Sequence, residues 1–386
     1  MKPASLLPCA LALFLGATLT LAAQPQIPDL SSLEARLQKL EAQVDALRQE
    51  NQGLRRELGY DAKGVAPVRV GVLGKEAKLA IGGYLQTNAE FGDAADSRFP
   101  AANRFLIRRA RLGIKGSFAN GFDFVLQSDW GNNSLNSTSG FRAQLSDAYV
   151  VWTRHAFANV TLGQFKVPYG YDQLLPDTKT LTIERTLPND MLTIPRQVGT
   201  MVAGSFFQKK LGYAAAVVNG NGTNVSFNDN EQFTSLGRVF ATAFDRDGVK
   251  LNLGVNGFTG RDTGTFTGRR TGRGADAQIY FAGAEIDAEI LRTHFDRDVG
   301  ADTDAQGWSL AGSYFFVPNK WQGIVRYESY DPNTDLASDQ TTLRTIGVTY
   351  FINGDDLKLQ LNYLIGTPPN SSKHQDRFIG RMQLVF

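Results

Sequence analysis

The sequence predicts an all-β transmembrane protein, a 16-stranded antiparallel β-barrel preceded by a short N-terminal coiled-coil helix. Three observations favour this fold class. Apolar and polar residues alternate from Val68 onward, short and long connections alternate along the chain, and the last alternation ends on the terminal Phe386. Outer-membrane barrels likewise have short turns at one end and longer loops at the other. A soluble β-sandwich also alternates, but the connection pattern favours the membrane barrel.

The overall composition resembles that of a soluble protein and excludes several other classes. The chain has 386 residues, of which 42% are apolar and 20% charged, and its formal net charge is +2. The single cysteine, Cys9, excludes an intrachain disulfide scaffold. No stretch of about 18 apolar residues follows the N-terminal segment, which excludes a helical membrane bundle. A net charge this close to zero gives no general attraction to nucleic acid.

Residues 1–23 have the layout of a secretory signal peptide. Lys2 precedes an apolar run over residues 6–21, and small residues up to Ala23 offer a cleavage site. Cleavage there would remove Cys9 and leave a mature chain without cysteine. The alternative is a membrane anchor, for which the apolar run is short.

The segment Asp29–Leu58 is predicted to form a periplasmic coiled coil. Its leucines recur at alternating spacings of three and four over four heptads, the pattern of a narrow apolar seam. Arg36 and Glu41 would pair between parallel chains, and Asn51 would fix the register. A single amphipathic helix on a globular core is the alternative, but the narrow seam favours a dimer or trimer. Residues 59–77 are then the linker to the barrel.

The remaining residues, 78–386, are predicted to form the barrel. Asp356–Ile365 shows the alternation most clearly, with apolar residues on one face and Lys, Gln and Asn on the other. Eight long connections imply 16 strands, provided that Asp276–Phe295 holds two strands with a tight turn near Gly283. Because 16 strands enclose an aqueous lumen, the inward face is expected to be hydrated. The long connections are expected near 92–103, 131–140, 167–196, 219–231, 259–275, 296–305, 331–339 and 366–375.

The densest basic run, residues 103–115, is predicted to place cations on the wall of the lumen. With its apolar residues facing lipid, this run directs Arg109, Arg111 and Lys115 inward, where guanidinium groups match phosphate geometry. The same argument adds Lys250, Arg326, Lys358, Arg377 and Arg381. The alternative is that these cations only neutralise lumen carboxylates, for which Glu90, Asp123, Asp129, Asp147 and Glu328 are available.

The segment 167–196 is the longest connection and the candidate for a constriction. Four prolines stiffen it and prevent strand pairing, and ordered loops of this length are usually functional. Folded inward, it would narrow the pore; the alternative is an outer lid with no part in selectivity. The residues assigned to the constriction are Lys179, Glu184, Arg185 and Arg196.

The sequence carries no evident catalytic, metal-binding or cofactor signature. His155, His294 and His374 are scattered among predicted turns and loops, and no metal-ligand spacing, phosphate-binding glycine loop or nucleophile elbow occurs. We therefore expect neither an enzyme nor a cofactor.

Several motifs of the predicted barrel resemble the phosphate-selective porin O and P family. The resemblance covers about residues 78–386 and implies a trimeric channel of 16 strands with an inward third loop, which passes phosphate or related anions. It places the family's Arg-Arg-x-Arg run at Arg108–Arg111. These motifs are specific for the family and not for the solute. They are Gly83–Gln86, Arg108–Leu112, Asp147–Tyr149, Leu162–Pro168, Ile183–Arg185 and the terminal strand.

Together these observations predict a homotrimer in the Gram-negative outer membrane that passively conducts small anions, with phosphate the leading solute. Its expected partners are outer-membrane lipid and the anion, with a periplasmic partner of the coiled coil left open. Two alternatives stay open: a general or weakly cation-selective pore, and a structural anchor that reaches the cell wall through the coiled coil. An enzyme barrel is the least favoured, because the histidines suggest no Ser–His pair.

Overall fold

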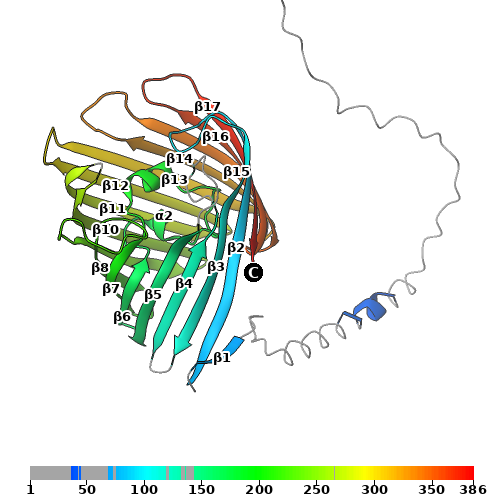
Figure 1. Ribbon diagram of the computed structural model, residues 1–386. Helices are drawn as coiled ribbons and strands as arrows, with labels where there is room; N and C mark the ends of the chain where they lie inside the picture. Colours follow the sequence, from blue (N-terminus) through cyan, green and yellow to red (C-terminus); the bar gives the residue numbers. More distant parts are fainter. Residues whose placement is uncertain are drawn as a thin grey trace, which may run out of the picture. The chain divides into compact units, whose positions relative to one another are not determined.

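In the part of the chain that the computed structural model describes, 16 antiparallel strands, β2 to β17, form a closed barrel (Figure 1). Each strand pairs with its neighbours in sequence order, and β17 pairs with β2 to close the ring. The last residue takes part in this closure. The amide of Gly83 donates to the carbonyl of Phe386 at 2.8 Å, and the amide of Phe386 donates back at 3.0 Å. The predicted barrel is confirmed.

Long strands run the height of the barrel, and two short helices interrupt the connection between β6 and β7. The helices are α2 (Tyr171–Leu174) and α3 (Leu187–Leu192). The strands are β1 (Val68–Val72), β2 (Lys75–Gly92), β3 (Arg104–Phe118), β4 (Phe122–Asp129), β5 (Gln144–His155), β6 (Ala158–Phe165), β7 (Gln197–Phe206), β8 (Leu211–Val218), β9 (Thr234–Arg246), β10 (Val249–Thr263), β11 (Thr267–Phe281), β12 (Ala284–Arg297), β13 (Thr303–Val317), β14 (Trp321–Asp331), β15 (Thr341–Asn353), β16 (Leu357–Thr367) and β17 (Gln375–Val385).

The structure describes residues 36–41, 43–44, 68–72, 75–118, 121–131, 135, 143–264 and 266–386. The chain divides into two units, Met1–Ala66 and Pro67–Phe386. The predicted signal peptide lies outside the described residues. So does the predicted coiled coil, apart from helical residues 36–41 and 43–44, and it stays a prediction. No described helix is both long and apolar enough to cross a membrane.

The predicted linker over 59–77 is shorter than expected, because strand structure begins within it. The strand β1 occupies 68–72 and pairs antiparallel with the first residues of β2, from Lys75 to Leu79. These residues extend the barrel wall at the end that carries the short turns. The linker is therefore confined to the part of this segment that precedes Val68.

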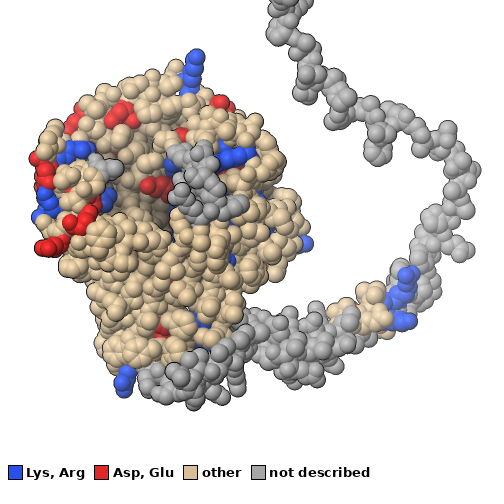
Figure 2. Space-filling model, viewed as in Figure 1, with Lys and Arg blue, Asp and Glu red and all other residues tan. Residues whose placement is uncertain are grey.

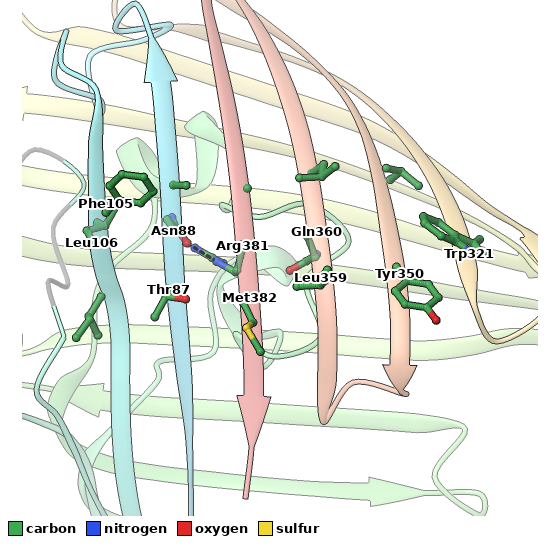
Figure 3. Close-up of a pocket in the computed structure, with 15 residues that line it drawn as sticks. Thr87, Asn88, Phe105, Leu106, Trp321, Tyr350, Leu359, Gln360, Arg381 and Met382 are labelled. Atoms are coloured by element: carbon green, nitrogen blue, oxygen red, sulfur yellow. Dashed lines mark hydrogen bonds between the residues drawn. The ribbon is translucent and has the colours of Figure 1, made fainter. Parts of the chain in front are cut away.

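Side chains alternate across the wall as the sequence predicts. In β16 and β17, Gln360 and Arg381 are 2% exposed, whereas Leu359 and Met382, each one residue along, are 41% and 50% exposed. Figure 3 shows Arg381 bonded to Asn88 of β2, with an Nε–Oδ1 distance of 2.8 Å. Residues of β2, β3 and β14–β17, most of them outward and apolar, line a groove of about 630 Å³. The apolar face of the barrel is thus its outer face.

Tight turns join the strands at one end of the barrel. The segment Asp276–Phe295 holds parts of two strands, as predicted, and β11 passes to β12 through Ala282 and Gly283. Both turn residues have positive φ, 46° and 81°, the requirement of a two-residue hairpin turn of type I′. The prediction of a long connection over 259–275 is wrong. Instead, β10 and β11 pair as a hairpin as far as Thr263 and Thr267, so most of this stretch is strand.

The lumen is partly packed, which corrects the expectation of a hydrated inward face. The connection between β6 and β7, residues 166–196 and here called the long connection, lies inside the ring of strands (Figure 1). Its apolar side chains pack against one side of the wall. The cluster comprises Phe165, Val167, Tyr169, Leu192 and Ile194 packed on Ala216, Val218, Leu236, Phe258, Leu291 and Ala305.

Candidate functional site

Two short helices give the long connection its shape. The helix α3 begins at a favourable cap, where the Thr186 hydroxyl accepts a bond from the amide of Asn189 at 3.2 Å, and Pro188 occupies the first turn. The helix α2 follows Gly170, whose φ of 79° suits glycine. Between the helices the chain runs without regular structure from Leu175 to Thr186, and this stretch carries the central charges of the site.

Polar side chains of the wall hold the backbone of the long connection. Glu289 of β12 accepts from the amide of Tyr171 at 2.5 Å, and Glu328 of β14 accepts from the amide of Leu187 at 2.5 Å. From β16, Asn362 accepts from the amide of Ile183 at 2.7 Å. These bonds satisfy buried amides that no strand partner could satisfy, so they fix the path of the connection across the lumen.

A bulge in β3 turns two neighbouring arginines inward. The register between β2 and β3 shifts at Gln86, which pairs with Arg109, while the next residue of β2 pairs with Ile107. Arg108 is therefore the extra residue, and both Arg108 and Arg109 are buried, 5% and 6% exposed. Arg111, two residues further, points the same way and is 5% exposed.

Asp177 of the long connection is the centre of this basic wall. Arg111 donates to its carboxylate at 2.5 Å, Arg185 at 2.9 Å, and Arg109 lies 3.6 Å away. The hydroxyl of Tyr84 donates to the same carboxylate at 3.0 Å. Arg111 also pairs with Asp129 of β4 at 2.7 Å.

Glu184 forms a second centre on the same connection. Arg108 donates to its two carboxylate oxygens at 3.0 Å each, and Arg381 of β17 bonds it as well. Arg109 lies 3.7 Å from Glu184 and so stands between the two carboxylates. The side chains of Arg109 and Glu184 are 7% and 4% exposed, so these pairs interact in a medium that screens them weakly.

The arginines keep both carboxylates ionised. Burial alone would raise the pKa of Asp177, but Arg109, Arg111 and Arg185 outweigh it and hold that pKa well below its ordinary value. Burial acts in the same way on Glu184, and Arg108 and Arg381 lower its pKa below the ordinary value. Asp177 and Glu184 therefore remain negatively charged at neutral pH.

Two more of the predicted cations bind the long connection directly. Arg326 of β14 donates to the Thr182 hydroxyl, to the carbonyl of Glu184 at 2.9 Å and to Glu328 at 3.0 Å. Lys358 of β16 donates to the carbonyl of Thr178 at 2.8 Å and pairs with Asp355 at 2.9 Å. Arg326 and Lys358 thus help to anchor the connection to the wall.

The remaining predicted cations lie apart from this network. Lys115, Lys179 and Lys250 have exposed side chains. Arg196 pairs with Asp147 of β5 at 2.8 Å. Arg377 pairs with Glu90 at 2.8 Å and donates to backbone carbonyls of the connection between β2 and β3. The structure therefore brings Arg109, Arg111, Arg185, Arg326, Lys358 and Arg381 together in this network, whereas Lys115, Lys179, Arg196, Lys250 and Arg377 take no part in it.

Acidic residues face the other side of the long connection. A small cavity of about 40 Å³ lies between the connection and β12–β14, with Asp172, Asp287 and Glu289 among its lining residues. Arg326 contributes the cation of this lining. The connection thus separates a basic wall, made by β3, β16 and β17, from an acidic one on β12.

The alternation of residues along the strands assigned neither Asp177 nor Arg108 to the site, although the family resemblance includes Arg108 in its arginine run. Asp177 is one of several acidic residues on a long segment, and nothing local distinguishes it from the others. Arg108 had a detectable signal, because the outward apolar residues of β3 are spaced by two except between Ile107 and Ala110, where the spacing is three. That break in the period marks the bulge.

The family model described as phosphate-selective porin O and P matches residues 80–285 and 262–386 of this chain. These matches cover nearly the whole barrel, including β3, the long connection and the terminal strand. Among curated proteins, no relative matches the sequence.

Solved porins share the fold at low sequence identity. An anion-selective porin from Comamonas acidovorans is 16% identical, with a TM-score of 0.62 over 81% of this chain and 100% of its own. OmpF of Salmonella typhi in complex with daunomycin is 13% identical, with a TM-score of 0.60 over 83% and 100%. OmpT of Vibrio cholerae in its trimer form is 12% identical, with a TM-score of 0.55 over 80% and 99%. With its fold and its family model in agreement, the chain belongs to the phosphate-selective porin O and P family and is a porin of the Gram-negative outer membrane.

Proposed function

We propose that the barrel passively conducts small anions, with phosphate the leading solute. The observation that carries this proposal is a surplus of cations around the long connection. Among the described residues joined by ion pairs to Asp177 and Glu184, five arginines meet four carboxylates. The arginines are Arg108, Arg109, Arg111, Arg185 and Arg381, and the carboxylates are Asp129, Asp172, Asp177 and Glu184.

This surplus of positive charge matters because it lies in the lumen, where buried protein groups adjoin water. Fixed cations at low effective dielectric concentrate anions, while several weak sites in sequence still let each anion leave. The exposed Lys115, Lys179 and Lys250 add further positive charge. The description of the family and the selectivity named for the Comamonas acidovorans porin also support the proposal.

Chloride current measured with added phosphate tests the choice of solute. In a planar bilayer, phosphate that occupies the same sites should reduce single-channel chloride current in a saturable way. The double variant Lys115→Gln/Lys250→Gln should weaken this effect, because both side chains are exposed and hold no structural contact in the described residues. Lys320→Gln, in the turn between β13 and β14, is the matched control. Chloride current that is independent of phosphate would reject phosphate as the solute.

We propose further that the long connection narrows the passage. Its support is the set of bonds from β12, β14 and β16 to the backbone of the connection, which hold it across the lumen. Removing residues 176–182 should then raise the single-channel conductance. A conductance equal to that of the unmodified protein would identify the connection as a lid with no part in the passage.

The proposed assembly is a homotrimer. The trimer form named for OmpT of Vibrio cholerae, which shares the fold, supports it. Migration of the unheated protein at about three times its monomer mass in detergent electrophoresis would agree with the proposal, and a monomeric band would oppose it. A periplasmic partner of the residues before the barrel stays open.

A weakly cation-selective pore is the second candidate. The observation that favours it is the acidic side of the cavity, where Asp172, Asp287 and Glu289 face the long connection. If ions pass on that side, the acidic wall sets the selectivity instead of the arginines. The sign of the reversal potential in a salt gradient separates the two candidates.

A further inference from the structure

Two arginines on the outer wall lie directly opposite one another. Arg273 of β11 and Arg292 of β12 are register partners, and both are exposed. They point outward, because their neighbours Gly272 and Leu291 are buried against the interior cluster that includes Phe258. Among the described residues neither arginine has an ion pair. Like charges opposite each other across two strands are destabilising, so this position favours a bound anion.

The two arginines line an open cavity on the outer wall. Its volume is about 690 Å³, within the range of small-molecule sites. His294 lies one position further toward the loops on the same face, and its Nδ1 is 3.0 Å from a carboxylate oxygen of Asp304. Asp304 is thus already engaged by a neighbour other than the arginines. The full lining is Thr271, Arg273, Arg292, His294, Asp304, Ala305, Gln306 and Thr334.

The position of the cavity along the barrel axis indicates which kind of anion reaches it. Arg292 pairs in register with Gln306 of β13, and Trp308 follows two residues further along β13, about 7 Å away along the strand. Trp308 faces outward and packs on Tyr327 of β14 with ring centroids 5.3 Å apart. Such aromatic residues mark the level where the apolar belt of a barrel meets the lipid headgroups.

The arrangement of charge agrees with this depth. Below the two arginines the outward residues of β12 and β13 are apolar, including Ile290 and Leu310. Figure 2 shows charged side chains gathered at the loop end of the barrel and an almost uncharged wall below them. The arginine pair therefore stands at the boundary of the apolar belt, on the outside of the barrel and away from the lumen.

From this position we infer that Arg273 and Arg292 form a binding site for the phosphate group of a membrane lipid, in the leaflet at the loop end. Two guanidinium groups side by side can each donate two bonds to phosphate oxygens, and a lipid phosphate would relieve their mutual repulsion. The remaining volume accommodates the sugar or glycerol to which the phosphate is attached. The acyl chains would continue down the apolar wall.

Native mass spectrometry of the full chain, released from detergent micelles, tests this site. The probes are a diphosphorylated glucosamine lipid and the same lipid with its phosphates removed. The unmodified protein should retain the phosphorylated lipid at least about tenfold better, since hydrogen bonds to charged groups are worth more than a factor of ten each. The variant Arg273→Gln/Arg292→Gln should lose that preference.

The matched control is Arg154→Gln/Arg246→Gln, which removes two exposed arginines beside the short turns and should keep the preference. Unchanged single-channel conductance and circular dichroism would show that the variants are folded and that the pore is separate from the site. Equal retention by the Arg273→Gln/Arg292→Gln variant would overturn the proposal, as would equal retention of the dephosphorylated lipid. Displacement by inorganic phosphate at the concentration of the lipid would show a site for free phosphate and would also overturn it.

Discussion

Asp177 shows how a single carboxylate can organise a basic lumen. Its oxygens meet Arg111 at 2.5 Å and Arg185 at 2.9 Å, with Arg109 at 3.6 Å, and its side chain is 6% exposed. A buried carboxylate of this kind binds the loop to the wall and sets how much positive charge is left for a solute. Its removal would leave buried cations without compensation, which costs more free energy than the pair itself contributes.

Asp177→Asn should therefore destabilise the protein and raise its preference for anions. Loss of one partner from a buried ion pair costs about 3–5 kcal/mol, and the freed arginines would attract solute anions more strongly. Thermal unfolding in detergent and the reversal potential measure the two effects. Glu231→Gln, an exposed position in the connection between β8 and β9, is the control. An Asp177→Asn protein as stable and as selective as this control would contradict the central role of the carboxylate.

Lys166 gives the lumen a charge that titrates near neutral pH. Burial lowers its pKa to about 7, and its Nζ donates to the carbonyl of Leu175 at 2.8 Å. The group is charged below that pH and neutral above it, so anion selectivity should fall as the pH rises from about 6 to about 8. Bilayer recordings at the two pH values measure the change. Lys166→Met should remove the pH dependence, and a variant that keeps it would assign the titration to another group.

At the scale of elements, the long connection is held by the wall more than by its own secondary structure. The helix α2 has four residues and α3 has six, too short to be stable alone. The side chains of Glu289 and Glu328 bind the backbone where α2 and α3 begin, and Asn362 binds the backbone of Ile183 between the two helices. These contacts with the wall, and not the two helices, therefore fix the position of the long connection in the lumen.

Thr186→Ala should loosen the long connection without unfolding the barrel. The Thr186 hydroxyl caps α3 through the amide of Asn189, and loss of such a cap costs about 1 kcal/mol. We expect more frequent brief fluctuations of the single-channel current. Thr186→Ser keeps a capping hydroxyl and should behave like the unmodified protein. Identical current noise in Thr186→Ala would show that α3 does not control the position of the loop.

The strands could be predicted because each one repeats a local signal. Alternation in Asp356–Ile365, the short turns and the terminal Phe386 are readable without any knowledge of distant partners. The hairpin from β10 to β11 was wrongly expected to be a long loop, because its glycines, threonines and charges resemble a loop in composition. Pairing with the neighbouring strands over residues 259–263 and 267–271 decides otherwise.

At the scale of the whole molecule, the pairing within the site could not be predicted. The phase of β3 placed Arg109 and Arg111 in the lumen, but their partner Asp177 is more than 60 residues away along the chain. Only the closed barrel and the inward loop bring these groups together. The apolar packing on one side of the lumen could not be predicted for the same reason, since the cluster forms between the long connection and the far wall.

The N-terminal segment and the barrel should act separately. If the protein is a pore, deletion of residues 29–58 should leave single-channel conductance and selectivity unchanged, because the conducting groups all lie within Pro67–Phe386. A protein that serves as an envelope anchor should instead lose its attachment to the cell wall on the same deletion. Bilayer recordings and fractionation of the cell envelope distinguish these outcomes.

We propose that the arginine-rich network makes this porin selective for anions. The most direct test is the zero-current potential of the unmodified protein in a planar bilayer between two concentrations of potassium chloride. The surplus of cations around Asp177 and Glu184 predicts that chloride is more permeant than potassium. The zero-current potential should then have the sign that chloride diffusion produces. A potential of the opposite sign would show that the acidic wall of Asp287 and Glu289 controls the passage, and it would contradict the claim.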